Sequence, residues 1–284
     1  MAIPGRRAAD LAMRVALGLS YDGAAFCGWQ TQPNVNTVQD AVEEALGSFL
    51  AGRVSTVCAG RTDTGVHALN QVIHLDTDAV RSPESWVRGL NALLPATVAV
   101  QWARAVPKDF HARFSAQVRE YLYVIRNDRV RSPLLDGRVG WVFRTLNRDA
   151  MQHAANRMLG EHDFSCFRSS ECQAASPVRH LQAIDIIEQA PYFYFRFRAN
   201  AFLHHMIRNI MGTLVYVGMG RQSPEWVDTL LASQDRRLAA PTFSPAGLYL
   251  AGVTYPEQYD IPRPDSRALL HLLAGFSLPS SGQL

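Results

Sequence analysis

The spacing of apolar and polar positions divides the chain into alternating strands and helices. In the first half, it predicts strands at residues 14–21, 71–75 and 98–102, a helix capped by Asn36 or Thr37, and a helix opened by Pro83. The second half repeats this rhythm, with strands predicted at residues 120–125, 181–187 and 192–198, a helix capped by Asn147, and a mostly apolar helix at residues 203–217. Two similar halves of this kind favour α+β subdomains that share a sheet.

The same pattern predicts how the chain is divided. We expect an N-terminal extension at residues 1–13, an N-terminal α+β half at 14–112, a C-terminal α+β half at 113–260, and a tail at 261–284. After Pro262 and Pro264, a short helix is expected at residues 269–273 of the tail, and a Pro-Ser-Ser-Gly segment follows it. No role follows for the tail from its sequence.

Composition narrows the classes of protein that remain possible. Hydrophobic residues make up 48% of the 284 positions and charged residues 19%, which excludes disorder as the main state. The net charge is +3, and the 28 basic residues are 27 arginines and Lys108. Arginine presents a planar fork of donors that suits phosphates and base edges.

Membrane and secreted proteins are also disfavoured. The longest uncharged apolar segment, residues 209–220, is too short to cross a bilayer, and Arg14 interrupts the apolar stretch after Arg6 and Arg7 that could pass for a twin-arginine signal. The four cysteines form no CxxC pair and no histidines have zinc-finger spacing. We therefore expect a cytoplasmic protein with reduced thiols and no structural metal.

The sharpest local signal is the segment GRTDTGVH at residues 60–67. Its glycines permit a tight turn, and Asp63 is its only carboxylate, two residues from the cation of Arg61. A neighbouring cation lowers the pKa of a carboxyl group and keeps it ionised, as a nucleophile requires. An ordinary turn in which Asp63 caps backbone amides is the alternative, and spacing alone clearly favours it.

Two further segments carry arginine among aromatic or apolar residues. Tyr121 and Tyr123 share one face of a predicted strand close to Arg113, where they could stack on bases or simply pack as core. Arg208 interrupts an apolar helix and needs a partner such as Asp63.

Other basic residues have less specific patterns. The adjacent residues His204 and His205 should point to different helix faces, which argues against a shared metal. Six arginines between residues 126 and 148 form either a phosphate-binding stripe or a solvated face.

These segments together resemble the tRNA pseudouridine synthase A family. The similarity runs in order from about residue 15 to residue 255 and rests on four motifs: GRTDTGVHA at 60–68, FHARFSA with REYLY at 110–123, NAFLHHMIRN at 200–209, and PT with AGLYL at 241–250. Thr64 is a small departure from the residue types expected at that place. The tail lies outside the family pattern.

The resemblance implies a fold, a reaction and a site. Two related halves, each like an RNA-recognition module, should share a continuous antiparallel sheet, with helices on one face and a catalytic cleft on the other. The implied reaction is the isomerisation of uridine to pseudouridine in the anticodon arm of tRNA, at roughly positions 38 to 40, on a base flipped out of the helix. A homodimer without cofactor or metal is implied as well.

Roles for single residues follow from the same resemblance. Asp63 would be the nucleophile, Arg208 would pair with it, and Tyr121 would stack on the flipped uracil and assist removal of the C5 proton. Further substrate-binding residues would be Arg61, Leu248, His67 and Arg113.

Two other functions remain as alternatives. A non-catalytic RNA-binding module could use the same tyrosines and arginines. A glycoside or nucleoside hydrolase normally needs two carboxylates that flank the scissile bond, and the motifs offer no second one near Asp63.

Overall fold

The computed structural model describes residues 13–263 of the chain. The N-terminal extension up to residue 12 and the tail from residue 264, with the helix expected at 269–273, lie outside the described residues. Within residues 13–263, no helix is both long enough and apolar enough to span a bilayer.

The two halves share the order strand, helix, two strands, helix, strand, to which the second half adds β6, β7 and α5. The first half contains β1 (Met13–Tyr21), α1 (Val38–Leu50), β2 (Val57–Cys58), β3 (His67–Thr77), α2 (Pro83–Asn91) and β4 (Val98–Val106). The second contains β5 (Val118–Asn127), β6 (Gly140–Val142), α3 (Arg148–Asn156), β7 (Gly160–Asp163), β8 (Val178–Gln189), β9 (Tyr192–Ala199), α4 (Met206–Gly218), α5 (Trp226–Ser233) and β10 (Leu248–Thr254).

Helix starts follow from capping side chains that the sequence already indicated. The side chain of Thr37 accepts a hydrogen bond from the backbone N–H of Asp40 at the start of α1, and Asn147 does the same for Ala150 at the start of α3. Proline occupies the first position of α2, where its missing N–H costs nothing. Local chemistry therefore fixes where these three helices begin.

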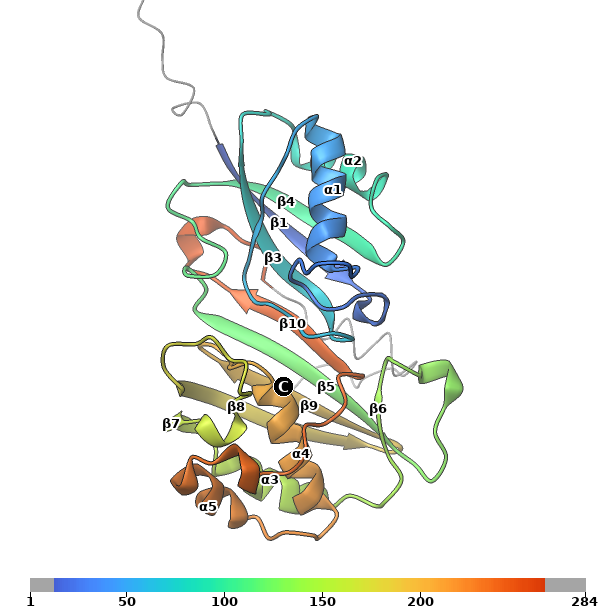
Figure 1. Cartoon of the computed structure of the whole chain (residues 1–284), viewed down its shortest axis with the longest axis vertical. Coiled ribbons are helices and arrows are strands. Elements are labelled where there is room, and N and C mark those ends of the chain that lie inside the picture. The colour runs from blue at the N-terminus through green and yellow to red at the C-terminus, as the bar shows by residue number, and fades with distance from the viewer. Residues whose placement is uncertain (1–12, 264–284) are drawn as a thin grey trace, which may run out of the picture.

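A single sheet runs through both halves (Figure 1). Its strand order is β4-β1-β3-β10-β5-β9-β8-β7, with β2 paired to β3 and β6 paired to β5. In each half the first strand lies between the last strand and the last but one: β1 between β4 and β3, and β5 between β10 and β9. The expected pair of related α+β halves with a continuous sheet is confirmed.

The last strand, β10, joins the halves. It pairs antiparallel with β5 through Leu250 and Tyr121, and parallel with β3 through Tyr249 and His67. The sheet is otherwise antiparallel, apart from the short parallel pair of β5 with β6. Because β10 closes the second half, it brings the far end of the chain beside the loop that carries Asp63.

The cleft differs from the expectation in one respect: it opens on the face that carries the helices. On β5, Tyr121 and Tyr123 share the main core with helix residues such as Leu46 and Met211, whereas Leu122 points to the opposite face. Helices α1 and α2 cover the N-terminal strands, and α3, α4 and α5 cover the C-terminal ones (Figure 1). The two helical groups leave the middle of the sheet open between them, and the cleft lies there.

Candidate active site

The cleft has a volume of about 1050 Å³. Segments from both halves line it: residues 27–30 and 56–64 from the first half, and residues 171–174 and 201–208 with Arg113, Arg119, Tyr121, Arg179 and Leu248 from the second. A cleft of this size lies at the upper end of the range for small-molecule sites and can take a whole nucleotide.

The loop that carries Asp63 is held from three sides. Gln71 donates from its side-chain amide to the carbonyl of Gly60 at 2.5 Å, and the hydroxyls of Tyr21 and Thr62 lie 2.8 Å apart in a buried hydrogen bond. Gly28 has a φ of +87°, and a Cβ there would lie 3.0 Å from the carbonyl oxygen of Thr62. Glycine is required at this close approach, which packs the loop against the neighbouring turn.

Arg119 ties the same loop to the second half. Its Nε and Nη2 donate to the carbonyl oxygen of Ala59 at 3.1 and 3.0 Å, its Nη1 donates to the carbonyl of Asn200 at 2.7 Å, and its Nη2 donates to that of Arg113 at 2.6 Å. The side chain is buried, so these bonds are shielded from water. Arg119 is therefore a positioning residue that holds three cleft segments together.

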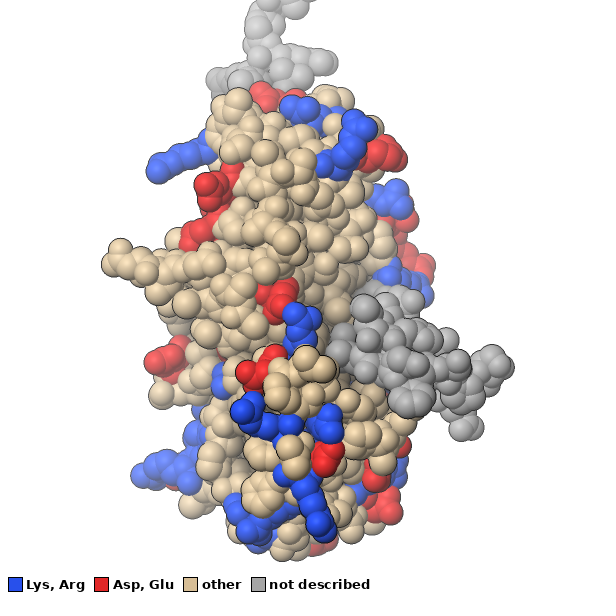
Figure 2. Space-filling model, turned by 90° about the vertical axis from the view of Figure 1, so that its right-hand side faces the viewer, with Lys and Arg blue, Asp and Glu red and all other residues tan. Residues whose placement is uncertain are grey.

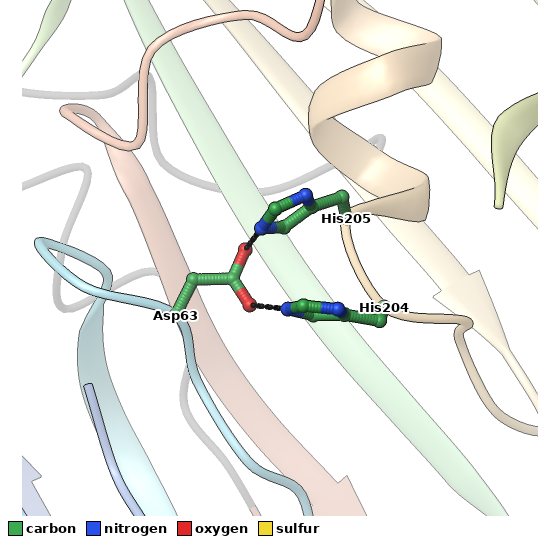
Figure 3. A group of neighbouring side chains, drawn as sticks. All are labelled: Asp63, His204 and His205. Carbon is green, nitrogen blue, oxygen red and sulfur yellow. Dashed lines mark ion pairs between the residues drawn. The ribbon is translucent and has the colours of Figure 1, made fainter. Parts of the chain in front are cut away.

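Three basic side chains of the second half converge on Asp63. Arg208 donates from Nη1 to Oδ2 at 3.1 Å and from Nε to the carbonyl of Phe243 at 3.0 Å. The Nε2 atoms of His204 and His205 lie 3.4 Å from Oδ1 and Oδ2, respectively, so that both rings face the carboxylate (Figure 3). The partner that the sequence proposed for Arg208 is confirmed.

These contacts decide the charge of Asp63. Burial alone would raise the pKa of this carboxyl group, but the contacts from His204, His205 and Arg208 outweigh burial and hold its pKa below the ordinary value. The Asp63 contact in turn raises the pKa of His204, while burial lowers that of His205. Asp63 is thus held as an anion beside the cation of Arg208, and its contact favours the protonated form of His204.

The placement of the two histidines corrects the expectation that they point to different helix faces. Helix α4 begins at Met206, so His204 and His205 precede it and do not follow helical spacing. His205 has a φ of 61°, in the left-handed region, and the two ring centroids lie 4.0 Å apart. The left-handed residue turns both rings to the same side, a departure that the apolar pattern of the helix did not signal.

Tyr121 and Leu248 form another wall of the cleft. The Tyr121 ring meets Phe202 edge to face, with centroids 5.2 Å apart, and Leu248 is buried. Burial raises the pKa of Tyr121, and the nearby Asp63 charge adds to the effect. The phenol therefore stays neutral. A neutral Tyr121 is suited to stack on a base and to offer its hydroxyl, but not to act as a phenolate base.

The other residues expected at the site separate into two groups. Arg61 and Arg113 line the cleft and are exposed. His67 lies elsewhere: it is buried, its Nδ1 accepts from the N–H of Gly23, and its Nε2 donates to the carbonyl of Gly137. Its ring stacks on Tyr249 with centroids 4.6 Å apart. We assign His67 to packing beneath the loop, not to the substrate contact that its motif implied.

Known proteins match this chain over most of its length. A family model described as tRNA pseudouridine synthase matches residues 19–115 and 154–256. The chain belongs to this family. The tRNA pseudouridine synthase A of Paraburkholderia phytofirmans is 60% identical over 253 residues, which cover 89% of this chain and 94% of the relative. That of Burkholderia multivorans is 60% identical over 250 residues, which cover 88% and 93%.

A solved structure shows a more distant likeness. A crystal structure of a Cbf5-Nop10-Gar1 complex is 13% identical with a TM-score of 0.35, over 71% of this chain and 45% of that chain. The membership in the pseudouridine synthase family rests on the sequence relatives, which confirm the resemblance read from the four motifs.

Two residues that line the cleft, Arg119 and Glu171, were not among the site residues expected from the sequence. Arg119 stood in a recognised motif without a role, because only the fold shows that it reaches Ala59 across the cleft. Glu171 is a second carboxylate that lines the cleft, on an exposed loop outside the four motifs. Composition and spacing carry no signal for Glu171.

The arginines between residues 126 and 148 are absent from the residues that line the cleft. Arg126 pairs with Asp128, Arg138 with Asp22, and Arg148 with Asp149. Figure 2 looks onto the side that carries β6, and Lys and Arg side chains gather on its lower part, interspersed with acidic ones. This distribution favours a solvated, partly paired surface over a stripe that continues the cleft.

Proposed function

We propose that this protein is a tRNA pseudouridine synthase that isomerises uridine in the anticodon stem and loop, at roughly positions 38 to 40, after the base has flipped into the cleft. The observation that carries the proposal is the geometry around Asp63. An ionised carboxylate faces the cleft, a cation 3.1 Å away orients it, and an aromatic ring and Leu248 line the same space. Membership in the family supports this assignment.

The reaction needs one carboxylate and no change of oxidation state. The bond between N1 and C1′ breaks, the uracil turns, and a bond forms between C5 and C1′. The proton of C5 is lost and N1 gains one, so atoms and electrons balance without a redox cofactor. Asp63 either attacks C1′ or stabilises the positive charge that develops there, and its anionic state serves both routes.

The remaining side chains orient the carboxylate, hold the uracil and exclude water from it. Arg208 fixes the direction of the carboxylate, because it is itself held by the carbonyl of Phe243. Tyr121 offers its face to the uracil and its neutral hydroxyl to the C5 proton on its way out. Leu248 excludes water from one side of the base.

The arginines of the cleft and its rim are suited to bind the backbone of the tRNA. Arg61 and Arg113 lie on the rim, and Arg179 lines the cleft with them. Their guanidinium groups can bind phosphates and stabilise the flipped state of the nucleotide. Binding should therefore weaken steeply as the salt concentration rises.

The assembly and the compartment belong to the same proposal. The family resemblance favours a homodimer whose two subunits contact one tRNA, and light scattering of the purified protein tests this. The four cysteines are free thiols, as expected of a protein from the reducing cytoplasm.

Tritium release from a tRNA transcript labelled at uridine C5 tests the activity and its nucleophile together. Release by the wild type and none by Asp63→Asn supports the proposal, because the amide keeps the shape and loses the charge. Release by both proteins would remove Asp63 from the reaction. No release with tight tRNA binding would favour an RNA-binding module, and free uracil in the product would indicate a hydrolase, for which Glu171 is the other carboxylate that lines the cleft.

A further inference from the structure

We propose that Asp63, His204 and His205 form a binding site for a divalent transition-metal ion of the zinc type, which inhibits the enzyme by capturing its carboxylate. The inhibitory part rests on the proposed function. The binding part does not, because it concerns only three side chains and an ion.

The ligand atoms have the spacing that such an ion requires. Nε2 of His204 lies 3.4 Å from Oδ1 of Asp63, Nε2 of His205 lies 3.4 Å from Oδ2, and one ligand atom from each of the three residues lies within 4.8 Å of the others. Two ligands bound tetrahedrally to Zn²⁺ at about 2.0–2.1 Å are roughly 3.3 Å apart. Small rotations of the rings are enough to place one ion between the three side chains.

The chemistry of the donors selects the class of ion. Two imidazoles and one carboxylate suit Zn²⁺ and similar borderline ions, whereas Mg²⁺ and Ca²⁺ prefer oxygen ligands alone. Three protein ligands leave the fourth position of a tetrahedral ion for water. Each of the three side chains is partly exposed and lines the cleft, so an ion from solution can reach them.

The backbone holds the two rings in place before any ion binds. His205 is the left-handed residue directly before α4, and its carbonyl accepts the N–H of Asn209 at 2.9 Å. The backbone N–H of His204 lies 3.5 Å from the Sγ of Cys172, which fixes the preceding residue as well. A site whose ligands are already positioned loses little conformational entropy on binding.

Arg208 opposes the ion and gives the proposal a distinctive signature. Its Nη1 lies 3.1 Å from Oδ2 of Asp63, so a dication at the carboxylate meets a fixed positive charge. Replacement of Arg208 by methionine removes this repulsion. The variant should bind zinc more tightly than the wild type, a gain that misfolding would not produce.

The test measures zinc binding to untagged protein, without tRNA, by competition with a fluorescent chelator. We expect one Zn²⁺ per chain in the wild type, affinity reduced at least about tenfold in His204→Gln and in His205→Gln, and increased affinity in Arg208→Met. His153→Gln, a substitution on the exposed side of α3, is the matched control and should bind as the wild type does. Thermal melting of each variant checks its fold.

Several results would overturn the proposal. Absence of stoichiometric binding would do so, as would equal binding by the wild type and both site-histidine variants. Binding that Cys172→Ser abolishes while the histidine variants retain it would assign the ion to the thiol instead.

The inhibitory part is tested by tritium release at rising Zn²⁺ concentration. We expect inhibition at the concentration that fills the site, with recovery on addition of a chelator. Full activity with the site occupied would refute inhibition. If the wild type binds zinc but releases no tritium at all, the proposed function fails and the metal site stands.

Discussion

Replacement of Arg208 by methionine tests the electrostatic reasoning at the site most directly. Methionine keeps the unbranched apolar stem of the arginine on helix α4, but it lacks the guanidinium group that donates to Oδ2 of Asp63 at 3.1 Å. The carbonyl of Phe243 loses its donor as well. Because the ionised form of Asp63 depends on these contacts, the substitution should raise the pKa of this carboxyl group.

The size of the effect follows from the geometry. A hydrogen bond to a charged group contributes about 1.5–3 kcal/mol, which corresponds to roughly a tenfold to hundredfold change in the ionisation equilibrium. The side chains of Arg208 and Asp63 are 15% and 18% exposed, so solvent screens the pair only weakly. His204 still faces the carboxylate, which places the expected change toward the lower end of this range.

The assay is single-turnover tritium release as a function of pH. The lowered pKa of Asp63 keeps the wild-type carboxylate ionised as the pH falls, so activity should persist well into the acidic range. In Arg208→Met the acid limb should move to higher pH, and the rate on the plateau should fall because the carboxylate is less well oriented. Arg237→Met, at an exposed arginine that pairs with Asp235, is the control. An unchanged acid limb in Arg208→Met would refute the pairing as the cause of the lowered pKa.

Three further substitutions probe the walls of the site. Tyr121→Phe keeps the stacking face and loses the hydroxyl, so tRNA binding should persist while turnover falls; equal turnover would remove the hydroxyl from proton transfer. Arg119→Met breaks the bonds that join three segments and should lower the free energy of unfolding in urea by about 3 kcal/mol, with a parallel loss of turnover. Gly212→Ala would place a Cβ 2.2 Å from the carbonyl oxygen of Pro241, and should reduce stability by about 1–3 kcal/mol and displace the segment that holds Arg208. Gly52→Ala, where the nearest atom is 4.0 Å away, should leave stability nearly unchanged.

The elements that sequence analysis predicted well are those determined by neighbouring residues. Thr37, Pro83 and Asn147 sit at the helix starts that their side chains or rings favour. The strands expected at residues 181–187 and 192–198 are longer in the structure, where β8 spans Val178–Gln189 and β9 spans Tyr192–Ala199. Apolar alternation marks the centre of a strand better than its ends.

The pairing of strands that lie far apart in the sequence could not be predicted from local patterns. The AGLYL motif at residues 246–250 was noticed only through the family resemblance, and nothing in its sequence states that β10 pairs parallel with β3 and antiparallel with β5. The same holds for the position of the cleft. Which part of the helical face stays open depends on how far α1 and α4 extend over the sheet, and that is a property of the packed molecule.

The site itself shows where local reasoning stops. The sequence proposed Asp63 and Arg208 as partners from charge alone, since a cation within an apolar helix requires an anion, and the two side chains meet at 3.1 Å. It failed for His204 and His205, because helical spacing was extended over residues that come before the helix. One left-handed residue then converts two apparently opposed rings into a pair that faces the carboxylate. Since both the charge of Asp63 and the proposed zinc site depend on this conformation, a substitution that disfavours the left-handed backbone at His205, such as valine, should impair both at once.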